Sequence, residues 1–467
     1  MTENTVTGTL RIVSPVDGSI YAERALAERT EALAAVGAAA KAQRGWRMTP
    51  LADRQRILSA AVDRFIAQRE AIAAELAWQM GRPVRQGGGE VDGFEERARY
   101  MIEAAPAALA NIDPGAKPGL RRYIRREPVG VVFTLVPWNF PYLTAVNSVW
   151  PALVAGNAVI LKHAQQTALC AERLTRALAE VGLPKGVFQA LHLSHATATA
   201  VMQHEAVRLV CFTGSVRGGR AVQRAAGAGF AGTGLELGGK DPAYVRADAD
   251  LTTAVTGVAE GAFFNAGQSC CSLERVYVHE SVYDGFVAGL VAEAQRLVLG
   301  NPLDPATTLG PMVRPAAAAF VRAQIAAAVH SGAQALIDPK SFPADDPEGA
   351  YLAPQVLVDV DHGMRVMTEE SFGPVVGVMR VRSDAEAVRL MNDSEFGLSA
   401  SIWTRDVTAA ERIGERLETG TVFMNRCDYL DPALAWTGVK HSGRGCTLSA
   451  LGYEPLTRPK SFHLQVE

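Results

Sequence analysis

From Val129 to Gly239, short β-branched runs alternate with helical stretches, and this alternation restricts the fold more than any other feature of the chain. The runs of this first stretch are Gly130–Val136, Ala158–Lys162 and Arg208–Phe212. Such an alternation predicts parallel βαβ units. It resumes after Cys270, with Arg275–His279 and Val375–Val381 as further strands. The sequence therefore predicts two successive α/β units.

Alanine-rich stretches studded with Arg and Glu predict the helices. They are Ala25–Ala42, Leu51–Met80 and Ala171–Val181, and their pattern is typical of amphipathic helices. Two polar strand patterns, Arg121–Glu127 and Leu456–Val466, fit neither unit, because their apolar content is too low for a core. We expect them to pair with another subunit, which predicts a homodimer or homotetramer.

Composition and charge exclude several classes of protein. The 467 residues carry a net charge of -3, which gives no electrostatic case for binding nucleic acid or an anionic membrane. No apolar segment approaches the roughly 20 residues of a membrane-spanning helix, and Met1–Pro15 is too polar for a signal peptide. The six cysteines form no CxxC pair, so we expect free thiols in the cytoplasm and no metal site.

The segment from Gly267 to Ser272 contains the strongest candidate for a catalytic residue, Cys270. A free cysteine taken alone is usually a small buried hydrophobic residue. This cysteine follows a Gly-Gln turn, which can present a thiol in a cleft, and nucleophilic use requires a nearby group that manages protons. Cys271, the next residue, has no assigned chemistry, and we expect it to pack away from the substrate.

A candidate base lies upstream, in the segment from Leu235 to Pro242. Glu236 stands between two leucines and is followed by two glycines. Apolar neighbours disfavour the charged form of a carboxyl group, which makes it a more competent base. The structural alternative is that Glu236 sits at the end of a strand or helix and pairs with Lys240. This segment alone leaves both interpretations open.

The third candidate is Asn139, in the segment Val136–Tyr142 at the end of the first predicted strand. Ligands bind at the carboxyl ends of strands in a parallel sheet. Held between aromatic and proline residues, Asn139 could point an amide N–H into the site as an oxyanion donor. Alternatively, it is a turn asparagine that satisfies local backbone groups.

Together the three segments resemble the aldehyde dehydrogenase family, and the resemblance covers essentially the whole chain. Further shared motifs are Phe212–Ser215, Glu369–Pro374 and Asn392–Ala400. The order of the motifs and the spacing between Glu236 and Cys270 also match. The implied α/β fold has a Rossmann-like coenzyme-binding domain (1–106 and 129–237), an α/β catalytic domain (238–445) and a small β oligomerisation arm (107–128 and 446–467).

The resemblance implies oxidation of an aldehyde to a carboxylic acid. Cys270 would attack the carbonyl as a thiolate, and the Asn139 amide and the Cys270 N–H would hold the oxyanion. After hydride transfer, Glu236 would activate the water that hydrolyses the thioester. Its presence favours this route over a CoA-acylating semialdehyde dehydrogenase. The other alternative is a catalytically silent structural relative. The presence of Cys270, Glu236 and Asn139 argues against it, because such a protein has no need of all three.

The resemblance also implies NAD as the cofactor, with NADP possible. It assigns cofactor contacts to nine positions: Val136, Trp138, Lys162, Gln165, Gly214, Ser215, Leu237, Glu370 and Phe372. Lys162 would bind the adenosine ribose, and Ser215 would meet the pyrophosphate at a helix N-terminus. Gln165 stands where NAD-preferring relatives often carry Glu, and a neutral amide does not repel a 2′-phosphate. Arg217 could attract that phosphate or face solvent.

The chain departs from the family pattern at Leu191–Ala196, where relatives commonly have a glycine-rich turn. The departure leaves the local backbone path near the cofactor open, although the phosphate contact in this family does not depend on a full GxGxxG. We expect the two histidines of this segment, His192 and His195, to be solvated loop residues. No third ligand accompanies them, so we prefer this interpretation to metal binding.

The substrate tunnel is the least constrained part of the prediction. The resemblance places along it Tyr142, Asn147 and Ser269, with the loop Asn425–Trp436 at its mouth. Asn147 stands where many relatives have an aromatic residue, which predicts a more polar tunnel. Asp428 and Asp431 could favour a cationic amino-aldehyde, whereas Arg426 could favour a carboxylated semialdehyde. These charges could also simply cap the loop.

Overall fold

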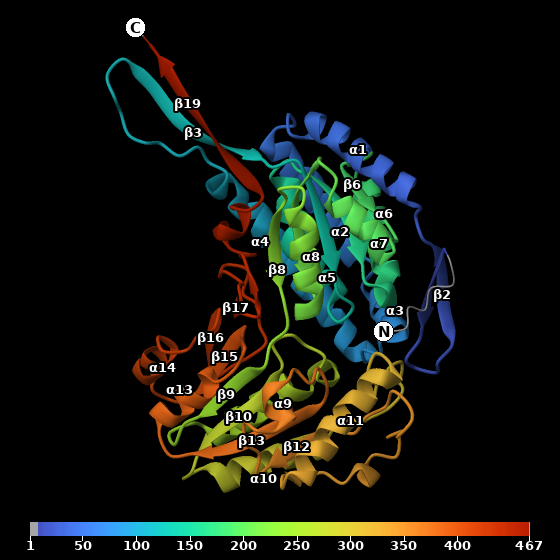
Figure 1. Ribbon diagram of the computed structural model, residues 1–467, viewed down its shortest axis with the longest axis vertical. Coiled ribbons are helices and arrows are strands. Elements are labelled where there is room, and N and C mark those ends of the chain that lie inside the picture. The colour runs from blue at the N-terminus through green and yellow to red at the C-terminus, as the bar shows by residue number, and fades with distance from the viewer. Residues whose placement is uncertain (1–7, 467) are drawn as a thin grey trace.

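The computed structural model describes residues 8–466. Residues 1–7, where the expected coenzyme-binding domain begins, and residue 467, where the expected arm ends, lie outside the described residues. Figure 1 shows two α/β units, one above the other, and a two-stranded ribbon that projects from the upper unit. Each unit contains one mostly parallel sheet. The predicted α/β fold is confirmed, and its expected strands lie within two residues of their predicted bounds.

The upper unit is built on a six-stranded sheet. In spatial order its strands are β18 (Gly443–Arg444), β8 (Gly232–Glu236), β7 (Val207–Thr213), β4 (Val131–Val136), β5 (Ala158–His163) and β6 (Phe188–Ala190). All are parallel except β18, which runs antiparallel to β8. Strand β18 therefore extends the first sheet, although it lies in the range that we expected to form the catalytic domain.

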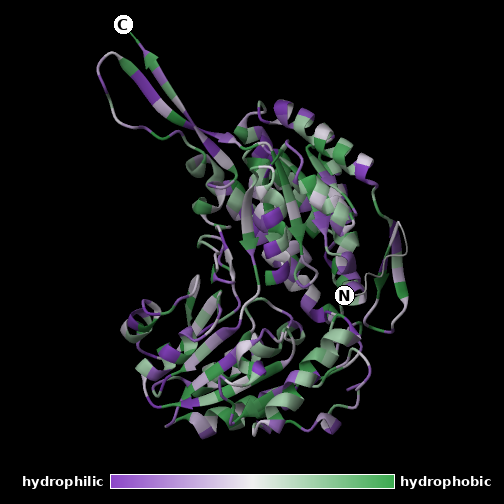
Figure 2. Ribbon diagram, in the orientation of Figure 1, coloured by the Kyte–Doolittle hydropathy of each residue, from purple (hydrophilic) through white to green (hydrophobic). Residues whose placement is uncertain are grey.

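Helices cover both faces of this sheet because both faces of its central strands are apolar. Along β4, Phe133 and Leu135 face one helical layer, and Val132 and Val136 face the other. The first layer consists of α1 (Arg29–Trp46), α7 (His195–Met202) and α8 (Val216–Gly227). The second consists of α2 (Leu51–Ile66), α3 (Arg69–Met80), α4 (Val84–Ala108), α5 (Pro141–Val154) and α6 (Ala168–Glu180). In Figure 2 the strands between these layers are largely hydrophobic.

The expected helical stretch Leu51–Met80 is divided into α2 and α3. The N–H of Ala67 bonds the carbonyl of Asp63, and the N–H of Gln68 bonds that of Phe65 three residues earlier, so the last turn of α2 tightens before the chain changes direction. The break allows Phe65 of α2 and Leu76 of α3 to enter the same core.

The lower unit is built on a seven-stranded sheet. In spatial order its strands are β11 (Gln334–Ala335), β12 (Gln355–Val358), β13 (Val375–Val381), β10 (Leu273–His279), β9 (Asp241–Val245), β15 (Ser399–Trp403) and β16 (Thr421–Met424). One face packs on α9 (Leu251–Phe263), α10 (Tyr283–Gln295), α11 (Pro315–His330) and α12 (Arg365–Thr368). The other packs on α13 (Asp384–Asn392) and α14 (Val407–Gly414).

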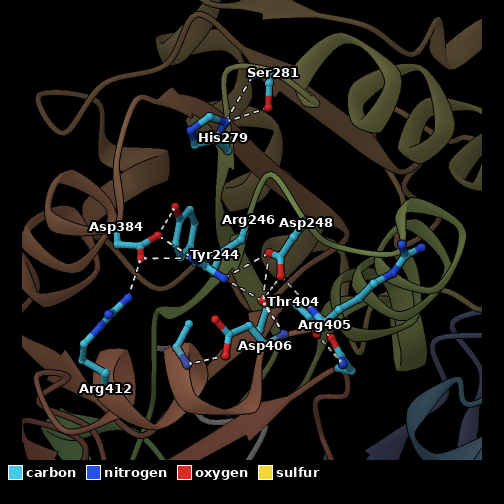
Figure 3. A network of polar contacts seen from close by, with 12 residues as sticks. Tyr244, Arg246, Asp248, His279, Ser281, Asp384, Thr404, Arg405, Asp406 and Arg412 are labelled. Carbon is cyan, nitrogen blue, oxygen red and sulfur yellow. Dashed lines mark hydrogen bonds and ion pairs between the residues drawn. The ribbon is translucent and has the colours of Figure 1, made fainter.

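A polar network joins the carboxyl ends of β9 and β15 to the start of α13 (Figure 3). Asp384 accepts hydrogen bonds from the Tyr244 hydroxyl (2.9 Å) and from Arg246 Nε (3.1 Å). Asp248 accepts from the Thr404 hydroxyl (2.9 and 2.8 Å). Because these carboxylates are satisfied by neighbouring side chains, the network fixes this end of the sheet.

The two polar strand patterns pair with each other. Strand β3 (Leu120–Pro128) lies antiparallel to β19 (Thr457–Gln465) over their full lengths and forms the projecting ribbon of Figure 1. Two smaller antiparallel pairs join β1 (Thr9–Val13) to β2 (Ile20–Ala25) and β14 (Phe396–Gly397) to β17 (Val439–Lys440). Among the described residues, no helix has the length and apolar character needed to cross a bilayer.

Candidate active site

The strand order of the upper sheet reverses at β4, since β5 lies on one side of it and β7 on the other. In open α/β sheets, ligands bind outside the carboxyl ends of the strands at such a point. Trp138 follows β4, Lys162 lies near the end of β5, Ser215 follows β7 and Leu237 follows β8. The structure thus places at one edge of the upper sheet four residues that were predicted separately, from the sequence, as cofactor contacts.

The candidate nucleophile follows a left-handed turn. Asn265, Ala266 and Gly267 have φ values of 53°, 56° and 67°. Cys270 lies three residues after this turn and three before β10 begins at Leu273. Consecutive left-handed residues are strained and persist only when their surroundings hold them. Gly267 is required here for a second reason, because a Cβ at this position would overlap the carbonyl oxygen of Gly373.

Side-chain amides hold this turn in place. Asn265 Nδ2 and Asn139 Nδ2 both donate to the backbone carbonyl of Gln268, at 3.2 and 3.1 Å. The Gln268 side chain accepts from the Val313 N–H (2.8 Å). Asn139 therefore bonds the chain two residues before Cys270, and the alternative of a purely local turn asparagine is wrong. Among the described residues its second amide hydrogen has no acceptor, which leaves one donor for an oxyanion.

Sequence reasoning missed the buried ion pair behind this turn. The Arg82 guanidinium pairs with Glu90, donates to the carbonyl of Asn139 and bonds Asn265 Oδ1 at 3.3 Å. Glu90 in turn accepts from the Tyr142 N–H at the start of α5 (2.7 Å). No linear spacing signals this role, because the partners of Arg82 lie up to 183 residues away.

We expect Arg82→Met to lower the free energy of unfolding by about 3–5 kcal/mol, because it leaves the Glu90 carboxylate buried without a partner. Thermal and denaturant unfolding of the purified protein measure the change. Arg69→Met is the matched control, since it breaks the exposed pair with Asp92 and should change stability by about 1 kcal/mol or less. Equal losses in the two variants would contradict a special role for the buried pair.

The candidate base lies at the end of β8, inside a cage of neutral donors. Glu236 Oε2 accepts from the Thr213 hydroxyl (2.8 Å), and Oε1 accepts from Thr447 Oγ1 (2.5 Å) and Asn147 Nδ2 (3.5 Å). The alternative of pairing with Lys240 is wrong, because Lys240 is buried against Glu274. Within the described residues, no cation forms an ion pair with Glu236, so its carboxylate is available as a base.

The two glycines after Glu236 lie directly against the nucleophile segment. A Cβ on Gly239 would overlap the carbonyl oxygen of Cys270, and a Cβ on Gly238 would overlap the Glu370 carboxylate. The Gly239 N–H donates to Glu370 Oε1 (3.1 Å), and burial raises the pKa of Glu370 to about 7. The two glycines thus allow the chain to pass between Cys270 and Glu370 directly after Glu236, where any side chain would clash.

The remaining expected cofactor residues fit a nicotinamide dinucleotide. Ser215 caps α8 by accepting from the Gly218 N–H (3.2 Å), and the first turn of α8 has no acidic side chain, as a pyrophosphate site requires. The rings of Trp138 and Phe372 meet edge to face at 5.6 Å, one from each unit.

Three further expected contacts lie at the same edge of the upper sheet. Val136 is buried at the end of β4, and the Gly214 N–H bonds the carbonyl of Glu236 (3.0 Å). Burial lowers the pKa of Lys162 to about 8. Gln165 turns its amide toward the Arg11 carbonyl (3.3 Å).

The histidines of the departure segment differ from each other. His195 is exposed at the start of α7, as expected. His192 is half-buried and contacts Glu172 (3.2 Å), which also binds Arg24, so the expectation of a solvated loop residue is wrong for His192. Across residues 8–466, no group of three His, Cys, Asp or Glu side chains could hold a metal ion.

The expected tunnel residues have unequal roles. Asp428 turns inward, where it accepts from Cys271 Sγ (2.8 Å) and Ser269 Oγ (3.4 Å), and burial raises its pKa to about 6. Cys271 therefore lies beside Ser269, which was expected along the tunnel, and Asp428 of the loop expected at its mouth. Tyr142 is fully buried in the core of the upper unit, so it does not face a tunnel.

The other two charges of the loop Asn425–Trp436 have local partners. Asp431 accepts from the Ala433 N–H (2.9 Å), as a loop cap does. The guanidinium of Arg426 lies 4.1 Å above the ring of Tyr429.

Comparison with known proteins agrees with this geometry. Residues 2–462 match the aldehyde dehydrogenase family. The chain is 36% identical to succinate-semialdehyde dehydrogenase [NADP(+)] 1 of Mycobacterium tuberculosis, over 94% of this chain and 96% of that protein. It is 35% identical to the NADP/NAD-dependent aldehyde dehydrogenase PuuC of Escherichia coli, over 98% and 93% of the two chains. The structure of betaine aldehyde dehydrogenase from Staphylococcus aureus in complex with NAD+ superposes with a TM-score of 0.92 at 29% identity, covering 98% and 92%.

The chain belongs to the aldehyde dehydrogenase family. It is an NAD(P)-dependent enzyme that oxidises an aldehyde to the carboxylic acid, as the sequence motifs predicted. NAD or NADP serves as the cofactor.

Proposed function

We propose that this enzyme oxidises a short carboxylated aldehyde by the hydrolytic route, with Cys270 as nucleophile and Glu236 as base. The observation that carries the hydrolytic route is the cage around Glu236, in which three neutral donors and no ion-paired cation surround the carboxylate. Neutral donors hold the carboxylate in a fixed orientation, and the carboxylate keeps its capacity to accept a proton from water.

In this mechanism the Cys270 thiolate adds to the carbonyl carbon and forms a thiohemiacetal. The Asn139 amide and the Cys270 N–H stabilise the developing oxyanion. NAD(P), which the nine expected residues of the two units would hold, would supply the hydride acceptor that allows the adduct to become a thioester. Glu236 then takes a proton from water, the water oxygen attacks the thioester carbon, and the Cys270 thiolate leaves as the carboxylic acid forms.

A carboxylated substrate is supported by the relatives. Proteins named succinate-semialdehyde dehydrogenase [NADP(+)] from Mycobacterium tuberculosis and Deinococcus radiodurans are 36% and 35% identical to this chain over more than nine-tenths of its length. Arg426, which the sequence offered for this role, instead stacks on an aromatic ring near the surface. The proposal assigns recognition of the substrate carboxylate to a different cation.

A panel of aldehydes tests the substrate class. We expect kcat/KM for succinate semialdehyde to exceed that for pentanal and for 4-aminobutanal by at least about tenfold, which corresponds to one charge-assisted contact. NAD and NADP are compared in parallel by absorbance of the reduced cofactor, with and without CoA. Preference for the amino-aldehyde would contradict the proposed substrate, and turnover that depends on CoA would contradict the hydrolytic route.

We also propose a homo-oligomer assembled through the ribbon of β3 and β19, with domains divided as the sequence predicts except for β18, which joins the upper sheet. The ribbon projects from the upper unit (Figure 1). Leu464, the second-last residue of β19, is 42% exposed. Because all six cysteines are free thiols, the proposal places the enzyme in the reducing cytoplasm. Sedimentation of the full chain, compared with one truncated before β19, tests the assembly.

A further inference from the structure

One buried cation near the candidate site has no role in the mechanism above. Arg97 lies on α4 with only 7% of its surface exposed. Its Nη1 donates to the carbonyl of Leu143 (2.8 Å) and to Asn147 Oδ1 (3.2 Å). Both partners are neutral, and no carboxylate of the described residues forms an ion pair with Arg97.

Other buried arginines of the chain are better satisfied. Arg82 pairs with Glu90, and Arg275 donates from all three nitrogens of its guanidinium to backbone carbonyls. Arg97 uses Nη1 alone. Its Nε and Nη2 donate to no described residue and keep a small solvent-accessible surface. A buried charge whose donors make no hydrogen bond to a carboxylate is incompletely satisfied, and such a pair of donors can receive an anion.

Arg97 is also close to the reacting groups. The Asn147 amide accepts from Arg97 at 3.2 Å and donates to Glu236 at 3.5 Å, so one side chain separates the cation from the candidate base. The guanidinium also interacts electrostatically with the Glu236 carboxylate and, more weakly, with Cys271, Glu90 and Asp428. A substrate whose carbonyl carbon lies between Cys270 and Glu236 would therefore place a group a few bonds further along near Arg97.

We propose that Arg97 binds the carboxylate of the substrate and thereby determines the specificity of the enzyme for short semialdehydes. This inference rests on the function proposed above. Nε and Nη2 form the planar fork that matches two carboxylate oxygens. Asn147 is a positioning residue in this arrangement, because its amide connects Arg97 to Glu236. Asp428 is engaged by Cys271 and Ser269, which keeps its own carboxylate from occupying the fork.

Arg97→Met tests the assignment with two substrates of similar length. For succinate semialdehyde, kcat/KM should fall about 10- to 100-fold, mainly through KM, as expected for the loss of a charged hydrogen-bonded contact. For uncharged pentanal, kcat/KM should stay within about twofold of the wild type. Arg99→Met is the matched control on the same helix, because Arg99 is exposed and binds only Asp63, Glu95 and Ser59. Arg99→Met should leave kcat/KM for both substrates unchanged.

Wild-type enzyme provides a second measurement that does not depend on the stability of a variant. Succinate should inhibit pentanal oxidation competitively, whereas uncharged butanamide should not. Failure of succinate to compete, or an equal loss of activity on both aldehydes in a folded Arg97→Met enzyme, would overturn the role of Arg97. If the wild type does not prefer succinate semialdehyde, the proposed substrate class fails instead. If turnover of both aldehydes depends on added CoA, the proposed hydrolytic function itself fails.

Discussion

The Cys270→Ala variant is expected to lose at least about 10⁴-fold in kcat while still binding NAD, because the proposed mechanism has no second nucleophile. The methyl group fits where the thiol was, and the turn before Cys270 is held by Asn265, Asn139 and Gln268 rather than by the thiol. Production of reduced cofactor measures the activity, and quenching of intrinsic fluorescence measures cofactor binding.

Cys271→Ala is the matched control for this experiment. Its thiol is committed to Asp428, so its removal should lower kcat by about tenfold or less. Full activity in Cys270→Ala, or an equal collapse in Cys271→Ala, would remove Cys270 from the role of nucleophile.

The Glu236→Gln variant is expected to separate the two halves of the reaction. A glutamine keeps one oxygen that can accept from a threonine hydroxyl, and its NH2 can donate to the oxygen of the other, so the local structure survives, but it cannot take a proton from water. Thioester hydrolysis should slow by about 10²–10⁴-fold, while the steps before it are affected less. Rapid mixing should then show a burst of reduced cofactor, close to one per site, followed by slow turnover.

Thr447→Val is the control for the base. It removes one donor to Glu236 Oε1 and keeps the carboxylate, so steady-state turnover should fall far less than in Glu236→Gln. Unimpaired turnover in Glu236→Gln would show that another group activates the water, and loss of the burst would assign Glu236 to the acylation half of the reaction.

The motifs that carry chemistry were predictable because each is a short contiguous segment. The residue types of each motif can be read directly from the linear sequence, in Gly267 to Cys270, in Glu236 to Lys240 and in the turn after β4. The strands were predictable as well, since buried parallel strands are continuous apolar runs such as β4 and β5. What the motifs leave out is the distance between them, and the close passage of Gly239 against Cys270 is visible only in three dimensions.

Charged residues were the main source of error, because a charge in an amphipathic stretch is typical of a solvated face. Arg97 stands one residue away from Glu96 and two from Arg99 on α4, and nothing in that pattern distinguishes the buried guanidinium from its exposed neighbour. His192 was expected in solvent but packs against Glu172, 20 residues earlier in the chain.

By itself, the sequence determined the α/β class, the reaction and the candidate residues Cys270, Glu236 and Asn139, because local composition and short motifs encode them. Only the tertiary structure decided which neighbours act on those residues: the Arg82–Glu90 pair behind the turn, the cage around Glu236 and the unpaired cation Arg97. The physical reason is that buried polar groups must find partners wherever the fold places them. Apart from Glu90, which lies 8 residues after Arg82, those partners lie tens to hundreds of residues away, where linear spacing carries no signal.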